Sequence, residues 1–262
     1  MITFLKLGGS LITDKTAENS FRDSVARRLA NEIARALEQP EAPSLLVGHG
    51  SGSFGHVAAS RHGTIHGVKS PDEWRGFAEV AVAAAELNTL VARALHSAGV
   101  PVWRLQPSAS ALARDGVLTR LELGPIRHAL EVGLVPLVYG DVALDGARGG
   151  TIISTETIFF YLAQHLPVKR ILLLGEVDGV YDAGKQVIER ITPTTLPQIV
   201  SLLGGSAGTD VTGGMITKVR DMVALVEKVP NLEIQILNGT VPGLAERALR
   251  GQRVGGTTIT AS

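Results

Sequence analysis

The chain has 262 residues, of which 45% are hydrophobic and 19% charged, and its 25 basic side chains balance its 25 acidic ones. This balance provides no basic field for nucleic acid or an anionic membrane, so we expect neither as a partner. The chain contains no cysteine, which excludes disulfides, thiolate nucleophiles and Cys-ligated zinc and is typical of a cytoplasmic protein.

The N-terminal segment predicts a buried strand at residues 2–7 that ends in the turn Gly8-Gly9-Ser10. We expect no signal peptide, because Lys6 interrupts the apolar run and no small-residue cleavage site follows. Apolar residues at every fourth position from Val25 to Leu37 predict an amphipathic helix, and residues 45–47 predict the next strand. The order strand, helix, strand indicates a βαβ series with a parallel sheet.

The most informative stretch is Gly48–His56, GHGSGSFGH, which directly follows the strand at residues 45–47. Glycines at the end of a strand let an anionic group approach the backbone amides closely. A single glycine-rich turn also arises for packing reasons, which makes it a weak signal alone. The similar turn at residues 8–10 strengthens it, and two such turns predict two phosphate-bearing ligands.

The middle of the chain alternates between predicted helices and strands. Residues 60–70 are predicted as a loop, and Ser70-Pro71 begins a helix that continues to about Ser97. The later elements are a strand at 100–105, a helix at 126–131, a strand at 134–139 that ends in Gly140-Asp141, and a hairpin of 142–144 with 151–153.

The C-terminal part predicts a helix capped by Ser154 or Thr155 and a buried strand at 171–174 with a turn at 176–181. Residues 209–218 form a predicted loop that leads into a helix, with Lys218 in or near its first turn. A cation there faces the positive end of the helix macrodipole unless an anion lies between them. The last predicted elements are a strand at 234–237, a helix at 244–249 and a strand at 257–260.

Lysines near glycine turns predict phosphoryl transfer, whose transition state needs charge stabilisation and positioning. The lysines in question are Lys6, Lys15 and Lys218, although a lysine taken singly is more often a solvated surface charge. The chain lacks the GxxxxGK[ST], GxGxxG and HExxH motifs. P-loop NTPase, simple Rossmann oxidoreductase and metalloprotease interpretations therefore lose support.

Five motifs in order resemble the amino acid kinase superfamily: KLGGS, GHGSGSFGH, Tyr139-Gly140-Asp141, EVDGVY and DVTGGMITK. Within it, the SFGH that ends at His56 resembles the isopentenyl phosphate kinase family. The resemblance implies an α/β fold, a three-layer αβα sandwich with a mainly parallel central sheet. It covers residues 1–262 as one domain, with an acceptor-binding lobe at about 1–165 and a nucleotide-binding lobe at about 166–262. It also implies a homodimer that transfers the γ-phosphate of ATP to isopentenyl phosphate in an alternative mevalonate route.

The resemblance also implies roles for individual residues. The catalytic residues would be Lys6, Lys15 and His56. The nucleotide would contact Lys6, Gly8, Gly9, Ser10, Gly52, Glu176, Asp178, Tyr181, Gly214 and Lys218. The acceptor would contact Ser51, His56 and Gly140. Asp141 and Asp178 have the alternative role of holding loops, and His56 that of capping or packing its helix. Mg²⁺ is expected with ATP, held mainly by phosphates because no protein cage is evident.

Three departures from the family pattern bear on these roles: Ser51 replaces a glycine, Thr155-Glu156 replaces a more acidic segment, and Glu176 replaces an aspartate. The nearest alternative function is a fosfomycin kinase-like phosphonate kinase. A predicted apolar wall along Trp74, Phe77 and Val80 favours a prenyl acceptor over that small polar substrate. Uridylate and acetylglutamate kinases are further alternatives, but neither needs His56. A nucleotide-binding sensor without turnover is the alternative from another class.

Overall fold

The computed structural model describes the chain except residues 15 and 205–210, and the side chains of residues 56–58, 60, 201–204 and 211–213 are also not described. Its centre is a sheet in which β1 (Ile2–Leu7) lies between β2 (Ser44–His49) and β9 (Val168–Gly175), parallel to both. The strand order is β10-β12-β11-β9-β1-β2-β6-β3. The other bounds are β3 Val102–Arg104, β6 Val135–Tyr139, β10 Arg190–Ile191, β11 Glu233–Asn238 and β12 Thr257–Ile259.

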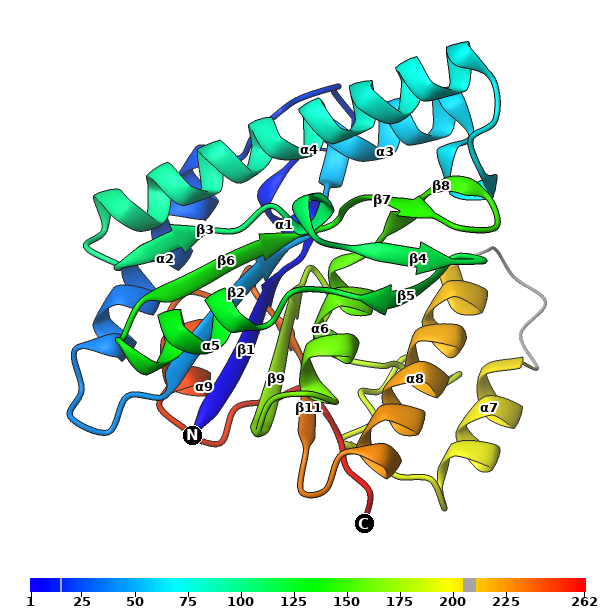
Figure 1. Cartoon of the computed structure of the whole chain (residues 1–262). Helices are drawn as coiled ribbons and strands as arrows, with labels where there is room; N and C mark the ends of the chain where they lie inside the picture. Colours follow the sequence, from blue (N-terminus) through cyan, green and yellow to red (C-terminus); the bar gives the residue numbers. More distant parts are fainter. Residues whose placement is uncertain (15, 205–210) are drawn as a thin grey trace.

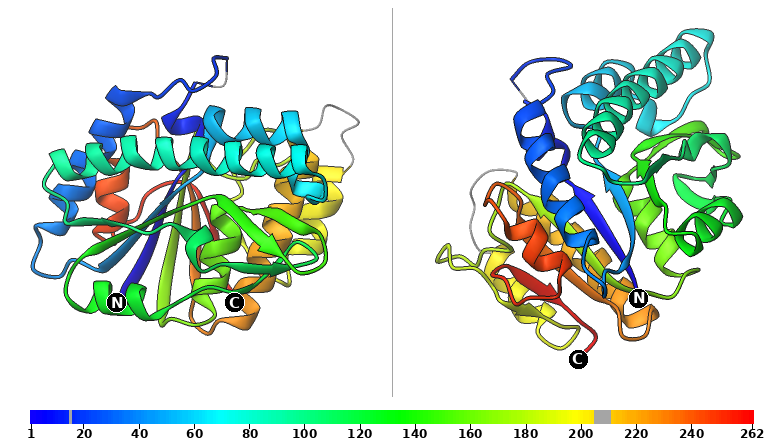
Figure 2. Two further views of the ribbon diagram at one scale, coloured as in Figure 1. Left: turned by 45° about the horizontal axis from the view of Figure 1, so that its top comes forward. Right: turned by 90° about the vertical axis from the view of Figure 1, so that its left-hand side faces the viewer.

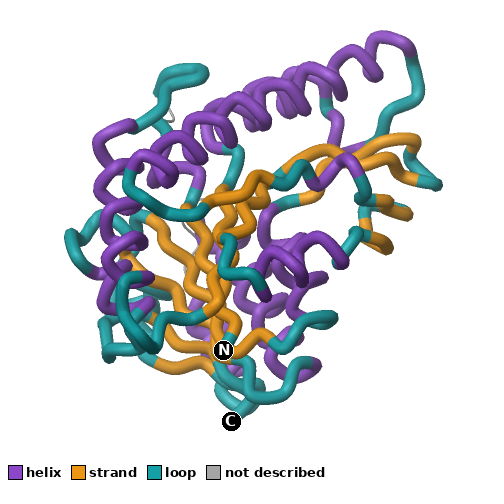
Figure 3. The backbone as a smooth tube through the Cα atoms, turned by 60° about the vertical axis from the view of Figure 1, so that its left-hand side comes forward, coloured by secondary structure: helices purple, strands orange, loops and turns teal. Residues whose placement is uncertain are grey.

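Helices cover both faces of this sheet, because alternate side chains of its buried strands point to opposite sides. On β1, Leu5 and Leu7 pack into the core formed with α2, α4 and α9, whereas Phe4 packs into the core formed with α5 to α8. Figures 1 and 3 show the strands between these two helical layers. The helix bounds are α2 Asp23–Leu37, α4 Pro71–Ser97, α5 Gly124–Glu131, α6 Thr155–Ala163, α7 Leu196–Gly204, α8 Val211–Lys228 and α9 Leu244–Leu249. The predicted αβα sandwich with a mainly parallel sheet is therefore confirmed, with β11 and β12 as an antiparallel pair.

A second sheet, of order β5-β4-β7-β8, lies beside α4. It contains the predicted hairpin, β7 (Asp141–Asp145) with β8 (Gly149–Ile153), and adds β4 (Leu112–Arg114) and β5 (Val117–Arg120), which were not predicted. The Asp145 carboxylate joins the two pairs by accepting backbone N–H groups of Asp115, Gly116, Ala147 and Arg148. Despite the opposing effect of burial, these bonds lower the pKa of Asp145 to about 2.

The segment after the second glycine turn differs from its prediction. Helix α3 spans Gly52–His62, so residues 60–62 are helical instead of part of a loop, and a 3-10 turn, η1, follows at Thr64–His66. The helix extends this far because it packs along α4, and Gly63 ends it in the left-handed conformation with φ 61°. Helix α4 itself begins as predicted, with a capping box between Ser70 and Glu73.

Helix α4 lies across one end of the molecule, and both chain termini lie at the opposite end (Figure 2). No helix in the described part of the chain combines the length and apolarity needed to cross a membrane.

Candidate active site

A cleft of about 1320 Å³ opens at the carboxyl ends of β1, β2, β6 and β9. This is the edge at which open α/β sheets bind their ligands, because the loops that leave the strands diverge there. The cleft is also bordered by α3, α4, η1, the β7–β8 hairpin, the start of α6, and α8. The lining includes Gly8, Gly9, Ser10, Gly50, Ser51, Gly52, Gly140 and Asp141, so the two predicted glycine turns face one space.

The two glycine turns are in direct backbone contact. A Cβ atom added to Gly9 would lie 2.5 Å from the amide nitrogen of Gly52, and one added to Gly50 would lie 2.9 Å from the amide nitrogen of Gly9. Buried Thr13 fixes the contact, because its hydroxyl donates to the Gly9 carbonyl at 2.8 Å and accepts from the Ser53 amide at 3.0 Å. The turns therefore require glycine for close approach.

A Gly9→Ala substitution is expected to lower the free energy of unfolding by about 1–3 kcal/mol, because the added methyl forces the two backbones apart. Urea denaturation at neutral pH measures this change. Gly146→Ala is the matched control, since a Cβ atom there meets no atom within 4 Å and the substitution should be neutral or slightly stabilising. Equal effects of the two substitutions would contradict the close contact.

The backbone N–H groups of the first glycine turn, residues 8–10, differ in whether they already donate a hydrogen bond within the protein. The Gly8 N–H donates to the Leu174 carbonyl at 2.8 Å, which extends the β1–β9 ladder by one residue. This bond engages the Gly8 amide, so Gly8, a predicted nucleotide contact, does not have this N–H left for a phosphate. Gly9 and Ser10 begin α1 (Gly9–Ile12), so their N–H groups have no intrahelical acceptor. These two amides are the ones suited to an anion.

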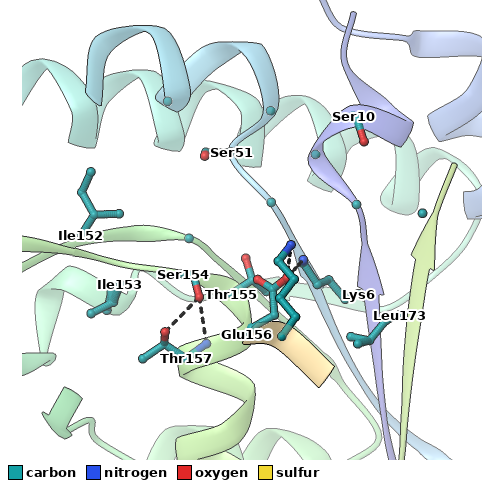
Figure 4. Close-up of a pocket in the computed structure, with 18 of the residues that line it drawn as sticks. Lys6, Ser10, Ser51, Ile152, Ile153, Ser154, Thr155, Glu156, Thr157 and Leu173 are labelled. Carbon is teal, nitrogen blue, oxygen red and sulfur yellow. Dashed lines mark hydrogen bonds and ion pairs between the residues drawn. The ribbon is translucent and has the colours of Figure 1, made fainter. Parts of the chain in front are cut away.

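Three charged side chains meet at the floor of the cleft. Lys6 points to the same face of β1 as Phe4, two residues earlier, and Phe4 packs on Phe159 with ring centroids 5.0 Å apart. Glu156 lies one helical turn before Phe159 on α6 and therefore faces Lys6. The Lys6 ammonium hydrogen-bonds to the Glu156 carboxylate (Figure 4), and Lys218 Nζ lies 3.7 Å from the same oxygen.

The electrostatics of this group favour a charged triad. Although burial disfavours its ionised form, the charges of Lys6 and Lys218 and the hydrogen bond from Lys6 bring the pKa of Glu156 to about 2. Burial lowers the pKa of Lys6, and the negative charge of Glu156 opposes this effect. The side chains of Lys6 and Glu156 are only 13% and 19% exposed, compared with 58% for Lys218. The group carries one net positive charge next to the glycine turns.

One end of the cleft is an apolar recess between α3, α4, η1 and β8. Its walls are formed by Ala59, Ile65, Val80, Ala84 and Ile152. Of the predicted apolar wall, only Val80 lines the cleft. Trp74 and Phe77 pack against each other and over Gly149 and Gly150 of the β7–β8 hairpin, so the prediction was wrong for these two aromatic residues.

The predicted acceptor contacts lie on the opposite side of the turns from β9. Ser51 and Gly140 line the cleft. Asp141 also borders it, but its carboxylate accepts the backbone N–H groups of Ser108 and Val142, which supports the alternative role of holding loops. Lys15 lies outside the described residues, as does the side chain of His56, whose backbone belongs to the first turns of α3.

The predicted nucleotide contacts divide into two sets. Lys6, Gly8, Gly9, Ser10, Gly52, Glu176 and Lys218 line the cleft, whereas Asp178, Tyr181 and Gly214 are not part of its lining. Asp178 instead accepts from Asn238 at 2.7 Å and from the Tyr181 hydroxyl at 3.0 Å, which stabilises the turn. Glu176 forms an ion pair with Arg22 at 2.6 Å.

The position of Lys218 differs from its prediction. It is the eighth residue of α8, which begins at Val211 and thus includes the glycine pair at 213–214. The helix macrodipole acts mainly within the first turn, so the ion pair with Glu156 has the stronger effect on this lysine. No group of three or more His, Asp or Glu side chains that could hold a metal ion occurs in the described part of the chain.

Comparison with known proteins gives consistent matches over the whole chain. The model of the amino acid kinase family matches residues 1–238. An isopentenyl phosphate kinase of Methanothermobacter thermautotrophicus is 38% identical over 269 residues, covering 98% of each chain. A solved structure of isopentenyl phosphate kinase superposes with a TM-score of 0.84 at 33% identity, covering 99% of this chain and all of the other. A product complex of the Thermoplasma acidophilum isopentenyl phosphate kinase superposes with a TM-score of 0.75 at 26% identity, over 99% of this chain and all of the other.

Proposed function

Because this chain belongs to the amino acid kinase family, we propose that its cleft transfers the γ-phosphoryl group of ATP to isopentenyl phosphate. The products are ADP and isopentenyl diphosphate. The observation that carries this proposal is the division of one cleft into a cationic, glycine-lined part and an apolar recess. The whole-length similarity to isopentenyl phosphate kinases supports the choice of acceptor.

The cationic part suits the nucleotide phosphates and the phosphoryl group in flight. Lys6 projects from the end of β1, Lys218 reaches in from α8, and Glu156 holds both ammonium groups at one point. Preorganised charges of this kind lower the barrier because they need no rearrangement when charge develops in the transition state. The Gly9 and Ser10 amides add uncharged donors at the same edge.

The acceptor needs little activation by the protein. A phosphate monoester has a second pKa of about 6, so it is already an anionic nucleophile at neutral pH. One of its oxygens attacks the γ-phosphorus in line as the bond to the β-phosphate oxygen breaks, and no proton has to be removed by a carboxylate base. His56, in the first turns of α3, would donate to the acceptor phosphate.

The apolar recess suits the prenyl tail. Ala59, Val80 and Ala84 are small or branched apolar residues on facing helices, and Ile65 and Ile152 close the sides. These five side chains offer no hydrogen bond to a polar acceptor, and burial of a five-carbon tail gains about 0.8 kcal/mol per methylene group. The recess therefore favours isopentenyl phosphate over a small polar phosphonate.

Mg²⁺ would accompany ATP and neutralise charge on its phosphate oxygens. Mg²⁺ prefers hard oxygen ligands. Among the residues that the structure describes, the carboxylates that line the cleft are those of Asp141, Asp221, Glu156 and Glu176. The Asp141 oxygens already accept backbone amides, so we infer that phosphates and water supply most of the ligands. We also infer a homodimer, as the family resemblance implies.

A coupled ADP-release assay with Mg-ATP tests the function, using isopentenyl phosphate, fosfomycin and UMP in parallel. We expect turnover on isopentenyl phosphate, and a fall of at least ~10²-fold in His56→Ala, the low end for a lost transition-state donor. The matched control is His128→Ala, because His128 lies on α5 with 78% of its side chain exposed.

Two results would contradict the proposal. Preferred turnover on fosfomycin would indicate a phosphonate kinase, and ATP binding without turnover on any acceptor would indicate a sensor. An equal loss of activity in His56→Ala and His128→Ala would remove His56 from the acceptor site.

A further inference from the structure

A series of hydrogen bonds connects β3, the edge strand of the main sheet, with the second glycine turn. Arg104 Nε donates to Asn88 Oδ1 at 2.8 Å, Asn88 Nδ2 lies 3.1 Å from His49 Nε2, and His49 Nδ1 lies 3.0 Å from the Gly50 carbonyl oxygen. Asn88 and His49 are completely buried. Of these four residues only Gly50 lines the cleft.

The two end groups of this series of hydrogen bonds, the Arg104 guanidinium and the Gly50 carbonyl, fix the direction of every bond in the series. Arginine can only donate, so Asn88 must present its oxygen to Arg104 and its NH₂ group to His49. His49 Nε2 must then be the acceptor, and the Gly50 carbonyl at the other end can only accept. The neutral imidazole with its proton on Nδ1 is therefore the one form of His49 that satisfies all the groups.

The surroundings of His49 agree with a neutral ring. Burial, together with the charges of Arg104 and Lys6, lowers the pKa of His49 to about 4, against the smaller opposing effect of its bond to Gly50. The other titratable side chain packed on the ring is Tyr139, which stacks on it with centroids 5.6 Å apart. Burial and the neighbouring Asp141 carboxylate raise the pKa of the Tyr139 hydroxyl, so this group adds no charge beside the ring.

The orientation of the Gly50–Ser51 peptide is the functional consequence. This peptide is trans, so its C=O and N–H groups point in opposite directions. Since the Gly50 carbonyl points to the buried His49 ring, the N–H of Ser51 points away from that ring, and Ser51 itself lines the cleft. Glycine at position 50 would otherwise allow this peptide to flip and place a carbonyl oxygen where an anion must bind.

We propose that Arg104, Asn88 and His49 are positioning residues that lock the Gly50–Ser51 peptide with its amide toward the phosphate groups. The Gly50 N–H is itself held by the Leu7 carbonyl at 3.0 Å, so the residue is fixed on both sides. The identity of the bound anion rests on the proposed function. The protonation state of His49 does not depend on the proposed function, and it can be measured without any substrate.

The first test is the tautomer, read by long-range ¹H–¹⁵N correlation NMR on the full chain labelled at histidine. We expect His49 to be protonated at Nδ1 and unprotonated at Nε2 throughout the neutral pH range, with its signals assigned by their loss in His49→Asn. An Nε2–H tautomer or an imidazolium in the wild type would overturn the proposal. Neither result depends on turnover, so a failure of the assigned reaction is distinguishable from a failure of this lock.

Asn88→Asp tests the coupling with an isosteric change. A carboxylate only accepts hydrogen bonds, so His49 Nε2 must gain a proton, and we expect the His49 signals to become those of an imidazolium at neutral pH. A His49 that remains neutral with Nδ1–H in this variant would show that Asn88 does not set its state, which overturns the chain of bonds.

A pair of substitutions at His49 tests the effect on catalysis. The amide nitrogen of Asn is as many bonds from Cα as Nδ1, whereas that of Gln corresponds to Nε2, so only His49→Asn can keep the donor to Gly50. We expect kcat/KM of His49→Gln to fall at least ~10-fold below that of His49→Asn, since one lost oriented donor typically costs ~10²–10³. Equal losses, or a larger loss in His49→Asn, would assign His49 a packing role instead.

Discussion

Replacing Lys6 with Met is expected to lower kcat for isopentenyl phosphate by about 10³-fold. A lysine about 4 Å from a phosphate oxygen contributes roughly 4 kcal/mol at an effective dielectric near 20, and about 1.4 kcal/mol corresponds to a tenfold change in rate. Met keeps the length and the apolar stem of the side chain, so the packing of β1 against α6 is retained. Single-turnover kinetics with saturating Mg-ATP measure the chemical step directly.

Two further lysines provide the controls for this prediction. Lys218→Met should reduce kcat less, by about 10-fold, because a side chain that is 58% exposed is screened by water. Lys228→Met, at the end of α8, should leave kcat within about twofold, as expected for a surface charge. A Lys6→Met enzyme that keeps more than about a tenth of its kcat would contradict the role assigned to Lys6.

The sequence predicts the main sheet well because its signals are local. The apolar runs at residues 2–7, 45–47 and 171–174 each lie within an observed strand, β1, β2 and β9, and a glycine directly follows each run. The second sheet was predicted only in part. Its β7–β8 hairpin has adjacent strands and a glycine-containing turn, whereas β4 and β5 depend on the distant Asp145 carboxylate that binds their turn.

Only those features of the candidate site that lie within a single sequence motif could be predicted. Each glycine turn is evident in the sequence, but their contact through Thr13 is a tertiary feature. The sequence shows Glu156 only as a departure from the family pattern, because its partner Lys6 is 150 positions away. Periodicity places Trp74, Phe77 and Val80 on one face of the helix. The neighbouring sequence does not indicate that the β7–β8 hairpin covers Trp74 and Phe77.

Replacing Glu156 with Gln is expected to lower the free energy of unfolding by about 3 kcal/mol at neutral pH, because the substitution leaves Lys6 buried without a counter-charge. The same carboxylate predicts the pH dependence. Its pKa in the folded protein, about 2, lies below the ordinary value of 4.5. A protonated Glu156 is equivalent to Gln, so the difference between wild type and variant is complete above about pH 5. It is lost as the pH falls toward 2, and urea denaturation at several pH values measures it.

Three comparisons decide whether this effect belongs to the buried ion pair. Glu18→Gln removes one carboxylate of an exposed pair, in which both side chains are about half exposed, and should cost less than about 1 kcal/mol. In a Lys6→Met background, Glu156→Gln should also cost less than about 1 kcal/mol, because only the exposed Lys218 remains to lose its partner. Tripolyphosphate should raise the Tm of Glu156→Gln more than that of the wild type, since its anionic oxygens take over the neutralisation of both lysines. If Glu156→Gln still lowers the free energy of unfolding by about 3 kcal/mol in the Lys6→Met background, then Glu156 stabilises the fold through α6 alone. The positions of the two lysines would then depend on some other contact.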